Sequence, residues 1–352
     1  MKNQENREDW LKQRKSGIGG SDVAAVLGLS AFRTPTDVYL DKIGEAEPQQ
    51  ATDSMHFGQL LEDVVAKEFE RRTGMKVQRV NTMLRENFLH RLADKLDRWS
   101  ELTSGWALAN IDRAIINPQI AKTVRVTKPE SKWNNKGLML TTNTILECKT
   151  ANAFAASEWG ESQEEEIRLG TVLTEHKIPV HYETQVQWYM GITGAKTCYV
   201  AVLIGGSDFR IYKVDRDEDV IQSLVEGCAK FWLHNVMARR PPEATVVQDV
   251  IKVHPVDDGS MVEADNAVAT DIGELRTLTE RISDLKKQSE VIKTRIADAL
   301  GDRTGFLIGG AKAVTFKEKT TTRLDTAALK RDFPQEVLQH QITTTTRVFK
   351  LY

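Results

Sequence analysis

The sequence has 352 residues, of which 40% are hydrophobic and 28% charged, and its formal net charge is −2. This composition is that of a globular protein long enough for two domains. The small net charge excludes a uniformly basic surface, so any contact with nucleic acid must come from local patches. Three cysteines and seven histidines lack metal-ligand spacing, which argues against a zinc site and predicts a reduced, cytoplasmic protein. We expect neither a signal peptide nor a membrane span.

The N-terminal part carries a glycine-rich run, residues 16–20, followed by Ser21 and Asp22 at the predicted start of a helix that ends near Gly28. Free backbone N–H groups at such a helix start can bind an anion, and Arg14 could contact the same anion. A plain glycine turn into a capped helix is the commoner explanation for a single stretch of this kind.

Residues 54–72 follow a helical pattern with one broad apolar face, and Glu62 lies in this helix. Alone, an acidic residue on such a helix is normally just solvated. Residues 77–85 predict a strand, and residues 86–104 predict an inserted polar excursion with helical character.

Residues 106–116 predict a second, buried strand that Asp112 interrupts. A lone acidic residue within an apolar strand is difficult to explain by packing. Residues 144–150 predict another buried strand, in which Glu147 and Lys149 point to the same side because side chains alternate along a strand. Glu-x-Lys is a weak signal on its own, since many exposed strands carry such an ion pair.

A helix is predicted over residues 182–191, and Tyr182 and Gln185 share one face of it because they are three residues apart. Two strands joined by a glycine turn follow within residues 197–214. A long helix over about residues 218–239 completes this part of the chain.

We interpret residues 1–240 as one domain, 241–261 as a linker and 262–352 as an extension with a helical arm and a small α+β tail. Apolar residues repeat every seven positions in the arm: Leu275, Leu278, Ile282, Leu285, Ile292 and Ile296, with Ser289 and Ala299 in the same register. This repeat predicts a helical hairpin arm or a coiled-coil contact. One amphipathic helix packed on its own domain fits equally well.

The tail is predicted to contain two strands within residues 306–316, a helix near residues 324–331 and a final strand at 347–351. Residues 301–352 carry nine Lys and Arg against five Asp and Glu. This excess is a modest indication of a nucleic-acid or acidic partner.

The order of these features, a helix acid, a strand Asp, a Glu-x-Lys strand and a helix with Gln, resembles the core of PD-(D/E)XK nucleases. More narrowly, the chain resembles the YqaJ-like viral recombinase family, which includes relatives of phage lambda exonuclease. The resemblance covers roughly residues 8–215. It is carried by Arg14 with residues 17–22, Gly58 with Glu62, residues 109–113, residues 146–149, and Tyr182 with residues 185–187. It implies an α/β fold, a mixed central sheet flanked by helices.

The resemblance further implies two bound Mg²⁺ ions, for which Mn²⁺ can substitute because both prefer oxygen ligands. Asp112, Glu147 and the backbone carbonyl of Cys148 would hold one ion. Asp112 and Glu62 would hold the other.

The remaining roles are also implied by the resemblance. Lys149 would orient or help to deprotonate the attacking water, Gln185 would position that water or the lysine, and Tyr182 would line the same pocket. Arg14 and Ser21 would bind the 5′-phosphate of a DNA end.

The implied activity is that of a 5′→3′ exonuclease on double-stranded DNA in a phage or prophage recombination system, in the bacterial host cytoplasm. It would leave 3′ overhangs for a single-strand annealing protein. By analogy alone, a trimeric ring is expected. The alternatives are a structure-specific endonuclease on the same core and a non-catalytic DNA-binding or scaffold protein.

Two features depart from the lambda enzyme. Residues 150–157 lack an arginine that would contact phosphate, and Lys132, Lys136 or Arg168 could take its place. The excursion at 86–104 and the long connection at 117–143 leave the substrate preference open.

Overall fold

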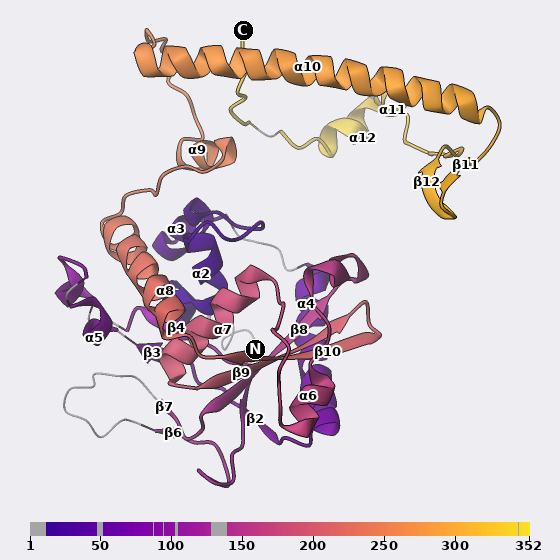
Figure 1. Cartoon of the computed structure of the whole chain (residues 1–352). Coiled ribbons are helices and arrows are strands. Elements are labelled where there is room, and N and C mark those ends of the chain that lie inside the picture. Colours follow the sequence, from indigo (N-terminus) through magenta and orange to yellow (C-terminus); the bar gives the residue numbers. More distant parts are fainter. Residues whose placement is uncertain are drawn as a thin grey trace. The chain divides into compact units, whose positions relative to one another are not determined.

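The computed structural model describes residues 12–47, 52–86, 88–93, 95–102, 105–127, 139–343 and 345–352. The chain forms two compact units that divide between Asp249 and Val250 (Figure 1). This point lies inside the segment 241–261 that the sequence predicts to be a linker.

The first unit contains the following helices: α2 (Gly20–Val26), α3 (Pro35–Ile43), α4 (Asp53–Thr73), α5 (Leu89–Leu92), α6 (Glu164–Leu169), α7 (Val180–Thr193) and α8 (Glu218–Phe231). Shorter 3-10 turns lie at Trp99–Glu101 and Ala153–Glu158, and a π-helical turn at Trp232–Met237 follows α8. Its strands are β1 (Ile18–Gly19), β2 (Val77–Arg79), β3 (Leu84–Glu86), β4 (Ala107–Ala109), β5 (Arg113–Ile115), β6 (Val126–Thr127), β7 (Met139–Leu140), β8 (Thr144–Ala151), β9 (Thr197–Ile204) and β10 (Asp208–Asp215).

The central sheet has five strands in the order β10-β9-β8-β5-β2. It is mixed, because β8 pairs parallel with β9 and antiparallel with β5. Helix α7 packs on one face and helices α4 and α6 on the other (Figure 1). The expected α/β fold with a mixed sheet between helices is therefore confirmed.

Strand β8 is covered on both faces of the sheet, and its side chains point alternately to one face and the other. Ile145 packs into the larger core on the α7 side, whereas Leu146 and Cys148 pack against Val65 and Phe69 of α4. An apolar residue on each side of a central strand explains why the run from Ile145 to Cys148 is almost continuously apolar.

Two of the predicted strands are wrong in extent. Residues 77–85 form β2 and β3, and residues 106–116 form β4 and β5, with each pair divided between two sheets. Strands β1, β4 and β3 make a separate three-stranded sheet, in which β1 runs parallel to β4. The chain leaves this sheet after Ala109 and enters the central sheet at Arg113, so Asp112 lies in the connection between them.

Other local differences are smaller. After β8, residues 153–158 form a 3-10 turn and residues 164–169 form α6. The excursion at 86–104 contains α5 and one 3-10 turn. Lys132 and Lys136 fall outside the described residues.

The end of the first unit is anchored by Asp249, which is fully buried. Its carboxylate accepts hydrogen bonds from the Thr34 hydroxyl at 2.7 Å and from the backbone and hydroxyl of Thr245 at 3.0 and 2.9 Å. Thr34 is also the N-cap of α3. Helix α9 (Val247–Val253) begins at this point, so part of the predicted linker is folded onto the first unit.

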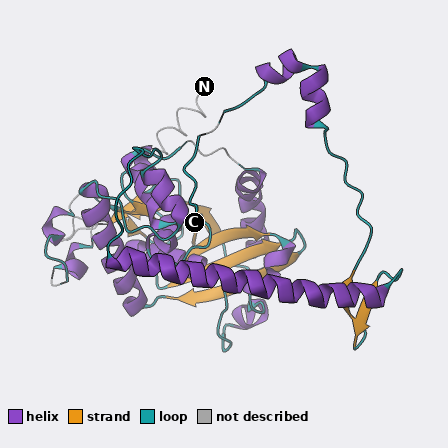
Figure 2. Cartoon of the chain, turned by 90° about the horizontal axis from the view of Figure 1, so that it is seen from above, coloured by secondary structure: helices purple, strands orange, loops and turns teal. Residues whose placement is uncertain are grey.

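The second unit contains α10 (Asn266–Leu300), the hairpin β11 (Gly305–Ile308) and β12 (Ala311–Thr315), and helices α11 (Thr326–Asp332) and α12 (Pro334–Gln339). Helix α10 is one uninterrupted helix (Figure 2), so the predicted helical hairpin is wrong. The predicted strand at 347–351 is also wrong, because these residues are irregular. Among the described residues, we find no helix that is long and apolar enough to cross a membrane.

Candidate active site

Asp112 and Glu147 come together at the point where β5 begins beside β8. Arg113 pairs with Leu146 and Ala114 with Ile145 across the two antiparallel strands. One further step along this register places Asp112 opposite Glu147, and directly opposed residues point to the same face. The Asp112 carboxylate accepts a hydrogen bond from the backbone N–H of Cys148 at 2.8 Å. The two carboxylates therefore share the face that α7 covers.

The Cys148 backbone also faces this site. Its N–H group points toward Asp112. Since the N–H and C=O of one residue in an extended strand point to the same side, its carbonyl faces that side as well. An oxygen from Cys148 is thus available beside the two carboxylates.

Lys149 and Gln185 enclose Glu147 in a closed network. The Lys149 ammonium lies 2.7 Å from Glu147 Oε1 and 3.1 Å from Gln185 Oε1. The Gln185 amide nitrogen donates to the same Glu147 oxygen at 2.7 Å. Gln185 comes from α7, and Tyr182, one turn earlier on that helix, places its ring centroid 4.6 Å from the Lys149 nitrogen. The structure thus brings together four residues predicted from the sequence.

Burial and neighbouring charges shift the pKa values of the acids and the lysine in this group. Burial raises the pKa of Asp112, and the charge of Glu147 raises it further. Burial likewise raises the pKa of Glu147, although Lys149 acts in the opposite direction. For Lys149, burial lowers the pKa, but the charges of Glu147 and Asp112 outweigh burial and raise it. The neighbouring carboxylates therefore favour the protonated form of Lys149.

One oxygen of Glu147 suits a positively charged ligand. Glu147 is 3% exposed, and its Oε2 atom has no hydrogen-bond partner among the described residues. A buried carboxylate oxygen without a partner is costly. A hard divalent cation accepts carboxylate and carbonyl oxygens as ligands. Asp112, Glu147 and the Cys148 carbonyl therefore fit such an ion.

Glu62 lies apart from this pair, on α4 and hence on the opposite side of the sheet. Because side chains alternate, Arg113 points away from Asp112, and its guanidinium is paired with Glu62 and Asp63. Arg79 also contacts Glu62, at 3.0 Å. In the part of the chain that the structure describes, no three His, Cys, Asp or Glu side chains are grouped to hold one metal ion. Glu62 nonetheless acts electrostatically on both carboxylates, since its charge contributes to the raised pKa of Asp112 and of Glu147.

The structure also brings Arg14 and Ser21 together, with the guanidinium 3.0 Å from the hydroxyl oxygen. Beside them is Asp22, whose carboxylate is fully buried and pairs with Lys42 at 2.7 Å and Arg33 at 2.8 Å. Asp22 also accepts the backbone N–H of Gly19 at 3.1 Å. A carboxylate of the protein itself thus occupies part of the predicted anion cradle.

Two glycines of this run are explained by packing. A Cβ on Gly17 would lie 2.2 Å from the Trp106 carbonyl oxygen, and one on Gly20 would lie 2.4 Å from the Tyr189 ring. Real Cβ atoms essentially never come this close to a neighbour, so a side chain at either position would force the neighbouring atoms to move. The close approach at Gly20 lets the Tyr189 ring sit beside Gln185.

Sequence reasoning assigned no role to Tyr189 or Arg113. The Tyr189 hydroxyl accepts a hydrogen bond from Gln185 at 3.1 Å. The available signal was the helical spacing, because residue 189 follows residue 185 by one turn. Arg113 is a buried cation that directly follows the candidate ligand Asp112. A charged residue in an apolar strand indicates an oppositely charged partner on the face to which its side chain points.

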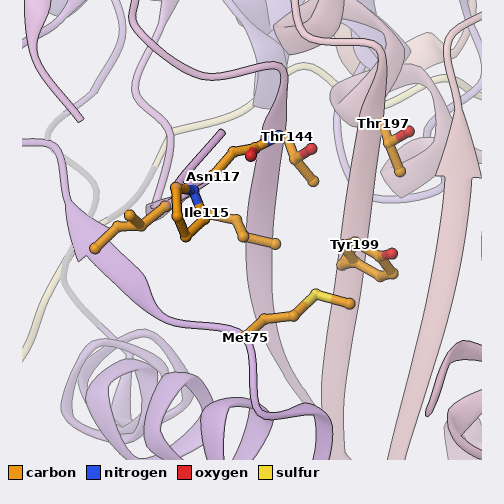
Figure 3. Close-up of a pocket in the computed structure, with 8 residues that line it drawn as sticks. Met75, Ile115, Asn117, Thr144, Thr197 and Tyr199 are labelled. Atoms are coloured by element: carbon orange, nitrogen blue, oxygen red, sulfur yellow. The ribbon is translucent and has the colours of Figure 1, made fainter. Parts of the chain in front are cut away.

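Arg168 and a surface pocket lie elsewhere in the first unit. Arg168 is on α6, which packs against α4 and β10, and it pairs with Glu165 at 3.8 Å. Figure 3 shows a surface pocket lined by Met75, Ile115, Asn117, Thr144, Thr197 and Tyr199. Thr144 and Thr197 begin β8 and β9, so this pocket is at the end of the sheet opposite Lys149.

The fold and site together define an α/β protein with two acids, a lysine and a glutamine converging at the central strand β8 of a mixed sheet. The chain matches the YqaJ-like viral recombinase domain over residues 9–196, and it belongs to that family. It is also 30% identical over 340 residues to the uncharacterized protein YqaJ of Bacillus subtilis (strain 168), covering 94% of this chain and 89% of that protein. The expected family is therefore confirmed.

Among solved structures, the chain is similar to an alkaline exonuclease (LHK-Exo) from Laribacter hongkongensis. That similarity has 18% identity and a TM-score of 0.42, and it covers 66% of this chain and 93% of the other. A phage-related exonuclease from Haemophilus somnus 129PT shows 11% identity and a TM-score of 0.39, with 63% and 96% covered.

Proposed function

We propose that the protein is a metal-dependent 5′→3′ exonuclease that degrades one strand of linear double-stranded DNA in a phage or prophage recombination system. It would leave 3′ overhangs for a single-strand annealing protein, and it would act as a homo-oligomer, by analogy a trimeric ring. The observation that carries this proposal is the unpartnered, buried Glu147 oxygen between Asp112 and Lys149.

Asp112, Glu147 and the Cys148 carbonyl would hold one Mg²⁺ or Mn²⁺, and Glu62 with Asp112 would hold a second. A bound pair of such ions would supply positive charge to the scissile phosphate and a more acidic water. Glu62 reaches that position only by releasing Arg113, its present partner.

The side chains around the carboxylates have separate tasks. The Lys149 ammonium would donate to a phosphate oxygen or to the attacking water, and so stabilise negative charge that develops there. Gln185 would hold Lys149 in place, since it contacts both that ammonium and Glu147. Tyr182 would cover the lysine and keep it on the side of the substrate. Arg14 and Ser21 would contact the 5′-phosphate of the DNA end.

The first experiment is digestion of linear double-stranded DNA, with and without a 5′-phosphate, in Mg²⁺. We expect the wild type to degrade the phosphorylated linear DNA faster and to leave closed circles intact. Lys149→Ala should abolish digestion, whereas Lys213→Ala, a partly exposed lysine on β10 paired with Asp215, should not change it.

A second arm tests the end-binding residues. Arg14→Ala should remove the advantage of the 5′-phosphate, whereas Lys15→Ala, an exposed neighbour, should keep it. Cutting of closed circles would replace the proposal with a structure-specific endonuclease. Absence of metal-dependent digestion of any DNA would leave a binding or scaffold role.

A further inference from the structure

Helix α10 presents a long apolar stripe that is not used inside its own unit. The helix runs from Asn266 to Leu300, and the side chain of its N-cap, Asp265, accepts the N–H of Val268 at 2.9 Å. At 1.5 Å per residue it is about 50 Å long. Its heptad positions a and d are mostly apolar: Leu275, Leu278, Ile282, Leu285, Ile292 and Ile296.

Within the second unit, the stripe is uncovered along the middle of the helix. Leu278, Ile282, Leu285 and Ile292 are between 48% and 54% exposed. Every residue from 276 to 295 is exposed. The expectation that this helix packs on its own domain is therefore wrong for these residues. An aligned apolar face of this length on a charged helix is typical of a surface that packs against another helix.

The charges beside the stripe are segregated by sign. The e and g positions border an a/d seam, and between residues 279 and 295 the charged residues at these positions are Arg281, Lys286, Lys293 and Arg295. The acids of the same segment occupy the outer positions: Glu280, Asp284 and Glu290. Since the whole helix carries six cations and six acids, this segregation is local and does not reflect the overall charge.

Such flanks disfavour pairing with a second copy of the same helix. In a parallel pair, Arg281 of one helix faces Lys286 of the other, and the contact occurs twice by symmetry. In an antiparallel pair, e positions face e positions and g positions face g positions, so a Lys or Arg again faces another Lys or Arg. Like charges at these positions act against a pairing.

The tail of the chain is no better matched. Residues 316–352 carry seven Lys and Arg against four Asp and Glu. A segment that covers the stripe should instead bring acids to Arg281, Lys286, Lys293 and Arg295.

We propose that α10 is the docking surface for a partner protein, and that the partner supplies an amphipathic helix whose apolar stripe is bordered by Asp or Glu. Apolar contact along Leu278, Ile282, Leu285 and Ile292 supplies the binding free energy, and the four cations select the partner by charge. This inference does not depend on the nuclease activity.

The test uses the full-length protein and two synthetic helical peptides of four heptads. Both peptides carry Leu at a and d, and they differ only at e and g, where one has Glu and the other Lys. Fluorescence anisotropy should show saturable binding of the Glu peptide, and binding of the Lys peptide should be on the order of tenfold weaker or less.

Matched charge reversals separate docking from general electrostatics. Arg281→Glu with Lys286→Glu changes the seam, whereas Arg276→Glu with Lys287→Glu makes the same change in net charge on the outer face. The seam variant should lose affinity for the Glu peptide on the order of tenfold and gain affinity for the Lys peptide. The outer variant should bind both peptides as the wild type does.

Four results would overturn the proposal. The first is equal binding of the two peptides, and the second is an equal effect of the two double variants. The third is self-association in analytical ultracentrifugation that Leu278→Ser with Leu285→Ser abolishes, which would assign the stripe to a second copy of this chain. A short duplex DNA serves as competitor, and its displacement of the Glu peptide would assign the cations to nucleic acid.

Discussion

Arg113 and Glu62 form an ion pair on the α4 face of the central sheet, opposite the face that holds Asp112 and Glu147. The Arg113 side chain is 4% exposed and pairs with Glu62 and with Asp63. Because Arg113 directly follows Asp112, the alternation that turns Asp112 toward Glu147 turns Arg113 toward α4. One pair of adjacent residues thus faces two groups of acids on opposite sides of the sheet.

Removal of Arg113 should destabilise the fold. Arg113→Ala leaves Glu62 and Asp63 without their buried counter-charge, and we expect the free energy of unfolding to fall by about 1–3 kcal/mol. Arg79→Ala removes a more exposed contact to the same Glu62, so its effect should stay within about 0.5 kcal/mol. Urea denaturation of both variants measures the difference. Equal losses would show that burial of Arg113 contributes nothing.

Asp112 should limit the stability of the metal-free protein. Asp112→Asn removes one of two buried carboxylates that repel each other and keeps an oxygen that can accept the Cys148 N–H. In EDTA we expect the melting temperature of this variant to equal or exceed that of the wild type. Mg²⁺ or Mn²⁺ should raise the melting temperature of the wild type, because a ligand that binds only the folded state stabilises it. It should not stabilise Asp112→Asn.

Asp215→Asn, an exposed change on β10, is the control for Asp112→Asn and should respond to metal as the wild type does. A metal-dependent rise in Asp112→Asn as large as that of the wild type would remove Asp112 from the ligand set.

Neighbouring glycines should differ sharply in their tolerance of alanine. Gly20→Ala would place a Cβ 2.4 Å from the Tyr189 ring, whereas Gly19→Ala meets only Asp22 Oδ2 at 3.5 Å, an ordinary contact. We expect Gly20→Ala to lower the free energy of unfolding by about 1–3 kcal/mol, and Gly19→Ala to change it little. If the displaced Tyr189 disturbs Gln185, DNA digestion by Gly20→Ala should also slow beyond what its folded fraction explains. Thermal melts and digestion rates of the two variants test both statements.

Asp22 should make stability depend on pH in acid. Burial raises its pKa, but Lys42, Arg14 and Arg33 outweigh burial and hold the pKa of Asp22 well below its usual range. The unfolded chain therefore binds this proton at a higher pH than the folded protein, near a pKa of about 3.9. The stabilisation is fully present above that value and is lost progressively as the pH falls below it.

Asp22→Asn tests this dependence. Lys42, whose side chain is 0% exposed, would lose its main partner, so we expect a loss of about 3–5 kcal/mol at neutral pH. Asp41→Asn removes a more exposed carboxylate 3.6 Å from the same ammonium and should cost far less. A wild-type free energy of unfolding that stays constant from pH 5 to pH 2 would contradict the role of Asp22.

The sequence predicted the parts of the site that depend on local periodicity. Strand alternation places Glu147 and Lys149 on one side, and the helical period places Tyr182 and Gln185 together, because both follow from backbone geometry alone. The long apolar face of α4 likewise predicted that helix within a residue at each end.

What the sequence did not predict depends on contacts between distant segments. Residues 106–116 are apolar except at Asn110, Asp112 and Arg113. These polar residues do not by themselves show that the chain passes from one sheet to another before Arg113. The partner of Glu62 is a residue 51 positions away. In the sequence, Gly17 and Gly20 show only that a side chain is absent. The groups that leave no room for one, the Trp106 carbonyl and the Tyr189 ring, are far along the chain.

Asp249 determines how far the first unit can be shortened from its C-terminal side. A protein that stops at Arg240, the end of the predicted nuclease domain, would lack this carboxylate and leave the Thr34 hydroxyl without its 2.7 Å acceptor at the start of α3. Helix α3 also carries Lys42, the counter-charge of Asp22 beside Arg14. Removal of the last few residues of the first unit would therefore loosen its N-terminal segment, which is proposed to bind the 5′-phosphate of the DNA end.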